Sequence, residues 1–274
     1  MTTAVRQAQR SVGDLLRTWR EHRRLSQLQF ALQAGISTRH LSFVETGRSH
    51  PSREMILRIA AHLDVPLRAR NHLLLVAGYA PAYQESALES PQMEVVRAAI
   101  RKVLTGHEPY PALVVDRRLN LVEANESLSI FTDGAAPELL APVANCMRLA
   151  LHPDGLAPRI VNLGEWRAHL LGRLRRIIAN TADPTIVELY EEIAAYPCDE
   201  PEPELDPHGA RDILAPLRIR YCSHELSFFS TIATFGMALD ISVSELSIES
   251  FYPADAETGV VLRRLYDQRH REGR

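Results

Sequence analysis

The sequence predicts two domains: an all-α domain of five helices, then an α+β domain built on an antiparallel five-stranded sheet. Apolar residues of the first 80 positions recur at helical spacing, whereas short runs after Pro111 alternate in the manner of strands. Charge divides at the same place, because residues 1–80 carry a net charge of +7 and residues 81–274 one of −10. The 274 residues are enough for two domains.

The first three helices are predicted to form a helix-turn-helix. Val12–His22 has apolar residues on one face and charged residues on the other. Ser26 is a favourable N-cap for the second helix, and Gly35 ends it, because the sharp turn needs a residue that tolerates a positive φ. Ser37 caps the third helix, and Gly47 ends it.

Two more helices and a connection follow. Ser52 begins the fourth helix, and Pro66 suits the first position of the fifth, which ends near Gly78. Residues 79–91 contain two prolines and few apolar residues, so they are predicted to be a linker. The helix Glu94–Leu104 comes next, and it either packs against the second domain or pairs with a second copy of the chain. The predicted boundaries are 1–80 for the helix-turn-helix domain, 81–106 for the linker and connecting helix, and 107–274 for the α+β domain.

The third helix is predicted to present Thr38, Arg39, Ser42 and Phe43 outward, since its leucine and valine face the core. The second helix of a helix-turn-helix enters the DNA major groove. There Arg39 can pair with guanine, and Phe43 or the Thr38 methyl group can touch a thymine methyl. The basic charge favours double-stranded DNA as the partner. The alternatives are a helical bundle with a solvated basic face and a helix-turn-helix that binds protein.

The pattern SQxxxAxxAGIS, which starts at Ser26, and the LSxxExG that follows resemble the Xre or Cro/repressor-type helix-turn-helix family. The resemblance covers about residues 12–78. By matching positions, it implies that Gln27 binds a phosphate and that Thr46 and Arg48 hold the neighbouring DNA backbone. It also implies that the four outward residues of the third helix meet base edges, with Ser37 close by. The aromatic ring in this set stands where the family often has a polar residue, which favours an apolar contact or a packing role there.

The second domain contains two strands, several helices and three more strands. The strands are predicted at Ala112–Val115, Leu119–Glu123, Leu217–Tyr221, Leu226–Phe235 and Ser244–Phe251. The helices are predicted at Glu165–Ala179, Thr185–Ala195 and, at the end of the chain, Glu257–Arg269. Residues 197–207 are acidic and rich in proline, so a mobile loop is expected. The order of elements is that of a PAS-like domain, in which a cavity between sheet and helices holds a small ligand.

This half also resembles the ligand-binding domain of MmyB-like transcription regulators. The matching segments are PALVVDRRLNLVEAN, MRLALHPDGLAPRIVNLGEW, LRRIIANTADP and LSFFSTIATFGMALDISVSELSIESFYPAD. Together with the helix-turn-helix, the resemblance spans nearly the whole chain. It implies a PAS-like pocket for a small-molecule effector, with a fatty acid or a similar small apolar molecule as the bound ligand. No other cofactor is expected.

The predicted pocket wall draws on apolar side chains of the helices and of the run 226–235. For each of them alone an ordinary core role is the stronger expectation, because a covered sheet needs this many apolar residues without any ligand. Arg159 either holds a ligand carboxylate or has no part in binding. The apolar candidates are Phe131, Met147, Leu151, Trp166, Leu170, Leu174, Phe228, Ile232 and Phe235.

Other classes of function find little support in the sequence. It holds no GxSxG, HExxH, P-loop or GxGxxG motif, so neither an enzyme nor a catalytic residue is expected. Cys222 and His224 are too few for a zinc site, and the three cysteines are expected to be reduced thiols. No apolar run approaches the roughly 20 residues of a membrane span. The N-terminus has no apolar stretch typical of a secretion signal.

The sequence therefore predicts a cytoplasmic DNA-binding transcription regulator. We expect a homodimer on a palindromic operator, with the second domain sensing a small molecule. Two alternatives stay open. In one, a protein partner controls DNA binding and the second domain serves dimerisation only. In the other, the protein is a cofactor-dependent redox sensor, and a reactive Cys222 would support this alternative.

Overall fold

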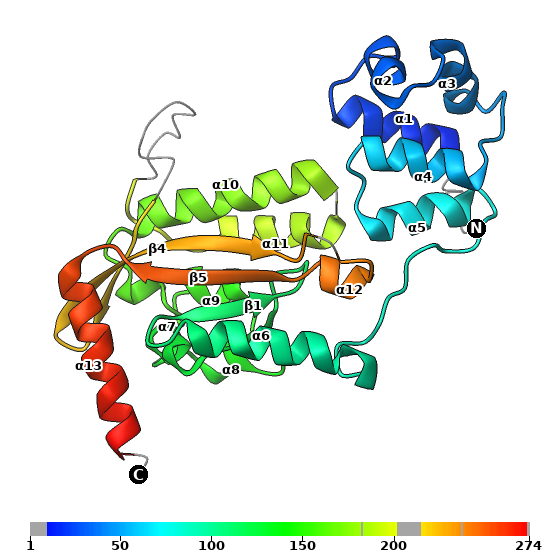
Figure 1. Ribbon diagram of the computed structural model, residues 1–274. Coiled ribbons are helices and arrows are strands. Elements are labelled where there is room, and N and C mark those ends of the chain that lie inside the picture. Colours follow the sequence, from blue (N-terminus) through cyan, green and yellow to red (C-terminus); the bar gives the residue numbers. More distant parts are fainter. Residues whose placement is uncertain (1–9, 182, 202–214, 237, 273–274) are drawn as a thin grey trace, which may run out of the picture. The chain divides into compact units, whose positions relative to one another are not determined.

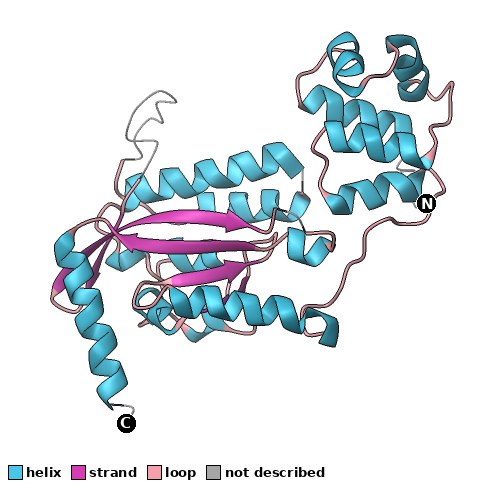
Figure 2. Cartoon of the chain, in the orientation of Figure 1, coloured by secondary structure: helices cyan, strands magenta, loops and turns pink. Residues whose placement is uncertain are grey.

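The computed structural model describes residues 10–181, 183–201, 215–236 and 238–272, in two compact units. The first unit comprises Met1–Ser86 together with Met237–Ser244, and the second comprises Ala87–Gly236 with Glu245–Arg274. The first unit is helical, whereas the second combines a sheet with helices (Figures 1 and 2).

The first unit is a bundle whose helices begin at serine caps. The side chains of Ser11, Ser26, Ser37 and Ser52 each accept a hydrogen bond from a backbone N–H of the following helix. Gly35 adopts a φ of 60°, which allows the turn between the second and third helices. The predicted helix-turn-helix is confirmed. Its helices are α1 (Val12–His22), α2 (Gln27–Ala34), α3 (Thr38–Glu45), α4 (Arg53–His62) and α5 (Leu67–Val76).

A short helix from the far end of the chain also belongs to the first unit. It is α12 (Ile241–Ser244), and its first residue donates a backbone hydrogen bond to the carbonyl oxygen of Gln84 at 2.8 Å. The carboxylate of Asp240 caps α12 by accepting the N–H of Ser242 at 2.8 Å. The prediction of a strand from Ser244 is therefore wrong at its start, because this helix occupies residues 241–244.

The second unit contains the predicted antiparallel sheet. The strand order is β2-β1-β5-β4-β3, and every neighbouring pair is antiparallel. The second strand begins later than predicted, because the carboxylate of Asp116 accepts the N–H groups of Arg118 and Asn120 and so lengthens the turn. The strands are β1 (Ala112–Val115), β2 (Leu121–Ala124), β3 (Leu217–Tyr221), β4 (His224–Thr234) and β5 (Ser247–Pro253).

Helices cover both faces of the sheet at β1, which explains why its sequence ALVV is apolar without alternation. On one face, Ile100 and Leu104 of α6 (Glu94–Gly106) pack in a core with Ala112 and Val114. The connecting helix thus packs within its own chain (Figure 1). The other face meets the main core, to which the long helix α10 (Leu163–Thr181) contributes.

The remaining helices surround this main core. Of the predicted loop at 197–207, the part beyond residue 201 lies outside the described residues. The other elements are η1 (Pro91–Met93), η2 (Glu126–Leu128), α7 (Ser129–Thr132), α8 (Pro137–Leu140), α9 (Cys146–Leu151), η3 (Ala157–Arg159), α11 (Pro184–Ala194) and α13 (Ala256–Glu272).

Candidate DNA-binding surface and ligand cavity

The outer face of α3 carries the four residues predicted to meet bases. Arg39 is exposed, while Thr38, Ser42 and Phe43 are half-buried. The guanidinium carbon of Arg39 lies 5.4 Å from the centre of the Phe43 ring. This cation–π contact limits the motion of the arginine and gives the ring a supporting role. The ring therefore serves at least to hold the arginine that the sequence assigns to guanine.

Ser37, predicted to lie close to the base edges, is at the start of α3, and the predicted backbone contacts Thr46 and Arg48 lie at and just past its end. The Ser37 oxygen accepts the N–H of His40 at 3.1 Å, which leaves its hydroxyl proton for an acceptor such as a phosphate. Thr46 donates its hydroxyl proton to the carbonyl oxygen of Ser42 at 2.7 Å, so its hydroxyl must turn before it can donate to DNA. Arg48 is exposed just past the helix.

A buried ion pair fixes α3 against α1. Two nitrogens of Arg20 donate to the two carboxylate oxygens of Glu45 at 2.6 and 2.9 Å. A third nitrogen of this arginine donates to the carbonyl oxygen of Leu25 at 2.6 Å. The Gln27 amide also donates to Glu45, at 2.8 Å, which occupies one of its two N–H groups. Gln27, predicted as a phosphate ligand, therefore also ties α2 to α3.

A further arginine stabilises the turn of the helix-turn-helix, and this contact was not predicted from the sequence. Arg58 of α4 donates to the carbonyl oxygens of Ala34 and Gly35 at 2.5 and 3.1 Å. These oxygens end α2, where a cation also meets the negative end of the helix dipole. Charged side chains of α1 and α4 thus fix the helices of the helix-turn-helix that carry the predicted DNA contacts.

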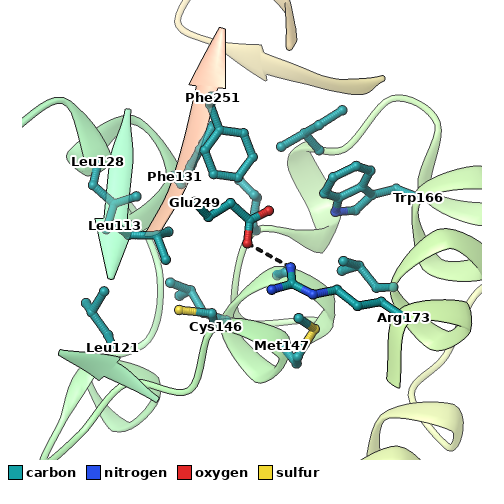
Figure 3. Close-up of a pocket in the computed structure, with 15 residues that line it drawn as sticks. Leu113, Leu121, Leu128, Phe131, Cys146, Met147, Trp166, Arg173, Glu249 and Phe251 are labelled. Carbon is teal, nitrogen blue, oxygen red and sulfur yellow. Dashed lines mark hydrogen bonds and ion pairs between the residues drawn. The ribbon is translucent and has the colours of Figure 1, made fainter. Parts of the chain in front are cut away.

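The second unit contains a cavity of about 60 Å³ between the sheet and the helices of the main core. Figure 3 shows its wall, which is mostly aliphatic and aromatic. Strands β1, β2, β3 and β5 and helices α9 and α10 all contribute. The lining residues are Leu113, Leu121, Leu128, Phe131, Cys146, Met147, Leu149, Ala150, Leu156, Trp166, Leu170, Arg173, Leu217, Glu249 and Phe251.

One ion pair stands in this apolar wall. Arg173 of α10 donates to a carboxylate oxygen of Glu249 on β5 at 2.7 Å (Figure 3). Their side chains are only 13% and 10% exposed. The other oxygen of Glu249 accepts a hydrogen bond from Ser230 at 3.2 Å. Neither charge was among the pocket residues predicted from the sequence, because α10 and β5 are buried on more than one side.

The thiol of Cys146 also lines the cavity. Burial, with a smaller contribution from the charge of Glu249, raises its pKa to about 12. The thiol therefore stays protonated at physiological pH and is a poor nucleophile. Cys222 by contrast is exposed, in the turn between β3 and β4. Within the described residues, no group of three or more His, Cys, Asp or Glu side chains could hold a metal ion.

The structure brings only part of the predicted pocket together. Phe131, Met147, Trp166 and Leu170 line the cavity. The other apolar candidates do not line it, because they lie in other parts of the core or at the surface. Leu151, Leu174 and Phe228 are buried in the surrounding core, Ile232 is 49% exposed on β4, and Phe235 packs against the core beneath α6.

Arg159 does not line the cavity either. Its guanidinium donates to the carbonyl oxygens of Ile130 and Phe131 at 2.9 and 2.8 Å, and so supports the backbone of α7. Burial lowers its pKa. These bonds occupy the fork with which it was predicted to hold a carboxylate. The arginine that lines the cavity is Arg173 and not Arg159.

Comparison with known families matches both units. Residues 96–265 match the MmyB-like transcription regulator ligand binding domain, and residues 16–69 match the helix-turn-helix family. The chain belongs to the MmyB-like transcription regulators. This MmyB-like regulator is therefore a DNA-binding transcription regulator with a ligand-binding domain, and families of these two kinds are in general not enzymes.

Other comparisons add little to the family assignment. Among solved structures, one described as "Structure of an RNA-binding Light-Oxygen-Voltage Receptor" is 16% identical, with a TM-score of 0.27. The match covers 97% of this chain and 66% of that one. No significant match was found among curated proteins. In the described part of the chain, no helix combines the length and the apolar character that crossing a membrane requires.

Proposed function

We propose that this regulator binds a palindromic operator as a homodimer, and that an apolar molecule in the cavity changes its affinity for DNA. The observation that supports the proposal is the composition of the cavity wall. Its wall is almost wholly apolar, and the charges of Arg173 and Glu249 offset each other within it. Such a wall suits a fatty-acid-like or other small apolar molecule.

The recognition helix of each protomer would occupy one half-site. In a dimeric helix-turn-helix protein, two such helices enter successive major grooves, so the half-sites lie roughly 34–36 Å apart. Arg39 supplies the base contact, with Phe43 as its support, while Ser37 and Arg48 hold the flanking phosphates. The basic charge of residues 1–80 adds sequence-independent attraction.

Strand β5 gives the cavity a route to the DNA-binding unit. It contributes Glu249 and Phe251 to the cavity wall, and it begins at Ser247, three residues after α12 ends at Ser244. Helix α12 belongs to the helix-turn-helix unit, where it pairs with Gln84. A ligand that displaces β5 would change how α12 packs there. This is allostery only if the ligand binds two states of the protein with different affinities.

The experiment is native mass spectrometry of the full chain, followed by denaturing extraction of any molecule it carries. Operator affinity is then measured with and without that molecule. We expect a dimer that retains an apolar molecule and whose operator affinity changes when the molecule is removed. Equal affinity in both states would contradict the proposal. A dimer free of any small molecule, and insensitive to added apolar compounds, would favour control by a protein partner.

A further inference from the structure

Trp166 presents an unused hydrogen-bond donor to the cavity. Its side chain lines the cavity and is only 4% exposed. The indole N–H is buried and has no hydrogen-bond partner among the described residues. Buried donors in native proteins are nearly always satisfied by the protein, by ordered water or by a ligand, so a donor in the wall of a ligand cavity is available to an acceptor atom of the ligand.

The indole is held in a fixed orientation. The His169 ring stacks on it, with ring centres 5.2 Å apart and an angle of 20° between the planes. In Figure 3 the ring extends from α10 into the cavity, and its nitrogen lies on the edge that faces Arg173 and Glu249. The donor therefore points toward the polar side of an otherwise apolar space.

The charges beside this donor determine which acceptor fits. Arg173 already pairs with Glu249 at 2.7 Å, so a ligand carboxylate could reach the arginine only by displacing that glutamate. Placed near the indole instead, the carboxylate would lie beside another carboxylate in a space of low polarity, where like charges repel strongly. A neutral carbonyl oxygen can accept the indole hydrogen bond without either cost.

We propose that the cavity selects a neutral acyl compound, such as an ester or amide, whose carbonyl oxygen accepts the hydrogen bond of Trp166. The alkyl chain then packs on Leu113, Leu128 and Phe131, and these side chains must move apart as it enters, because an acyl ester is larger than the cavity of about 60 Å³. This inference rests on the proposed function, because it takes the cavity as the ligand site. It restricts the expected ligand from fatty-acid-like molecules in general to those whose carboxyl group is converted to an ester or amide.

The test compares methyl hexanoate with hexanoate at pH 7.5, by calorimetry on the full chain. We expect the ester to bind at least tenfold more tightly than the acid. Trp166→Phe removes the N–H and keeps an aromatic ring, so it should reduce ester affinity at least fivefold. The matched control is Trp19→Phe, which removes the other of the two tryptophans from the helix-turn-helix unit and should leave ester binding unchanged.

A second variant tests the charge argument separately. Glu249→Gln frees Arg173 for a carboxylate, so hexanoate affinity should rise at least tenfold while ester affinity changes less than threefold. In the Trp19→Phe background, Trp166 emission should shift when the ester binds. Tighter binding of hexanoate than of the ester by the unmodified chain would overturn the selectivity. Equal ester binding by Trp166→Phe would overturn the role of the indole. If neither probe binds at millimolar concentration, the acyl selectivity proposed here fails. The proposed function fails as well only when native mass spectrometry finds no bound molecule and operator affinity does not respond to other apolar compounds.

Discussion

Both units of the regulator bury an arginine–glutamate pair, and the two pairs differ in their surroundings. Arg20 and Glu45 form a double hydrogen bond, and Leu25 and Gln27 occupy further donors and acceptors. Arg173 and Glu249 share a single hydrogen bond at the wall of a cavity. The first pair is enclosed and fixes the packing of helices, whereas the second faces the cavity that we propose as the ligand site. The comparison shows that the neighbours of a buried charge, more than its partner, determine its role.

The largest effect should follow from opening the enclosed pair. Glu45→Ala leaves the guanidinium of Arg20 buried without its carboxylate, which should destabilise the helix-turn-helix unit by about 3–5 kcal/mol. Trp19 reports its unfolding by urea in a Trp166→Phe background. The control is Arg17→Ala, whose exposed pair with Glu21 should leave the midpoint nearly unchanged. A small effect of Glu45→Ala would remove the contrast between the two pairs.

The cavity pair should be less costly to break. Arg173→Met leaves the carboxylate of Glu249 with Ser230 as its donor, and the cavity can admit water beside it. We expect a loss of roughly 2 kcal/mol, the value of a hydrogen bond to a charged group. Urea unfolding followed by Trp166 emission in a Trp19→Phe background measures it. A loss as large as that of Glu45→Ala would show that this pair is a structural clamp as well.

On the predicted DNA-binding face of α3, a substitution should change operator specificity. Arg39→Ala should cost about 1–3 kcal/mol of operator affinity and relax the preference at one base pair. Arg48→Ala is the matched comparison, since loss of a phosphate contact should weaken binding to all sequences alike. Binding to a library of operator variants distinguishes the two. If Arg39→Ala leaves the choice of operator intact, the orientation proposed for α3 is wrong.

The helix-turn-helix was predictable almost residue by residue because its signals are local. Ser26 and Gly35 mark the start and end of α2 by their own conformational preferences. The pair of Arg20 and Glu45 was not predicted, since the two are 25 positions apart and charges normally favour solvent. Glu45 lies beside Val44 on the core side of α3, and this placement was the available signal.

In the second unit, the order of strands and helices along the chain followed from the sequence, but the cavity wall did not. A strand alternates between two faces, and the pattern alone does not say that both are covered. Ile248 packs beneath α6 while Glu249 faces the cavity, so both neighbours are buried. The same ambiguity placed Phe228 and Ile232 in the predicted pocket. Which side chains line a cavity depends on packing between distant segments, which local patterns do not encode.

The smallest predicted effect concerns the connection between the two units. Asp240→Ala removes the cap of α12 and should weaken its packing on the first unit by about 1 kcal/mol. Operator affinity of the ligand-free protein should change little, while the change in affinity that the ligand causes should shrink several-fold. Asp255→Ala is the matched control, because Asp255 accepts the N–H of Thr258 at 2.7 Å at the start of α13, beyond the other end of β5. Since coupling is reciprocal, operator DNA should change ligand affinity by the same factor, and Asp240→Ala should reduce that factor equally. If both variants reduce the ligand effect alike, the loss reflects general loosening of β5, and α12 is not the route.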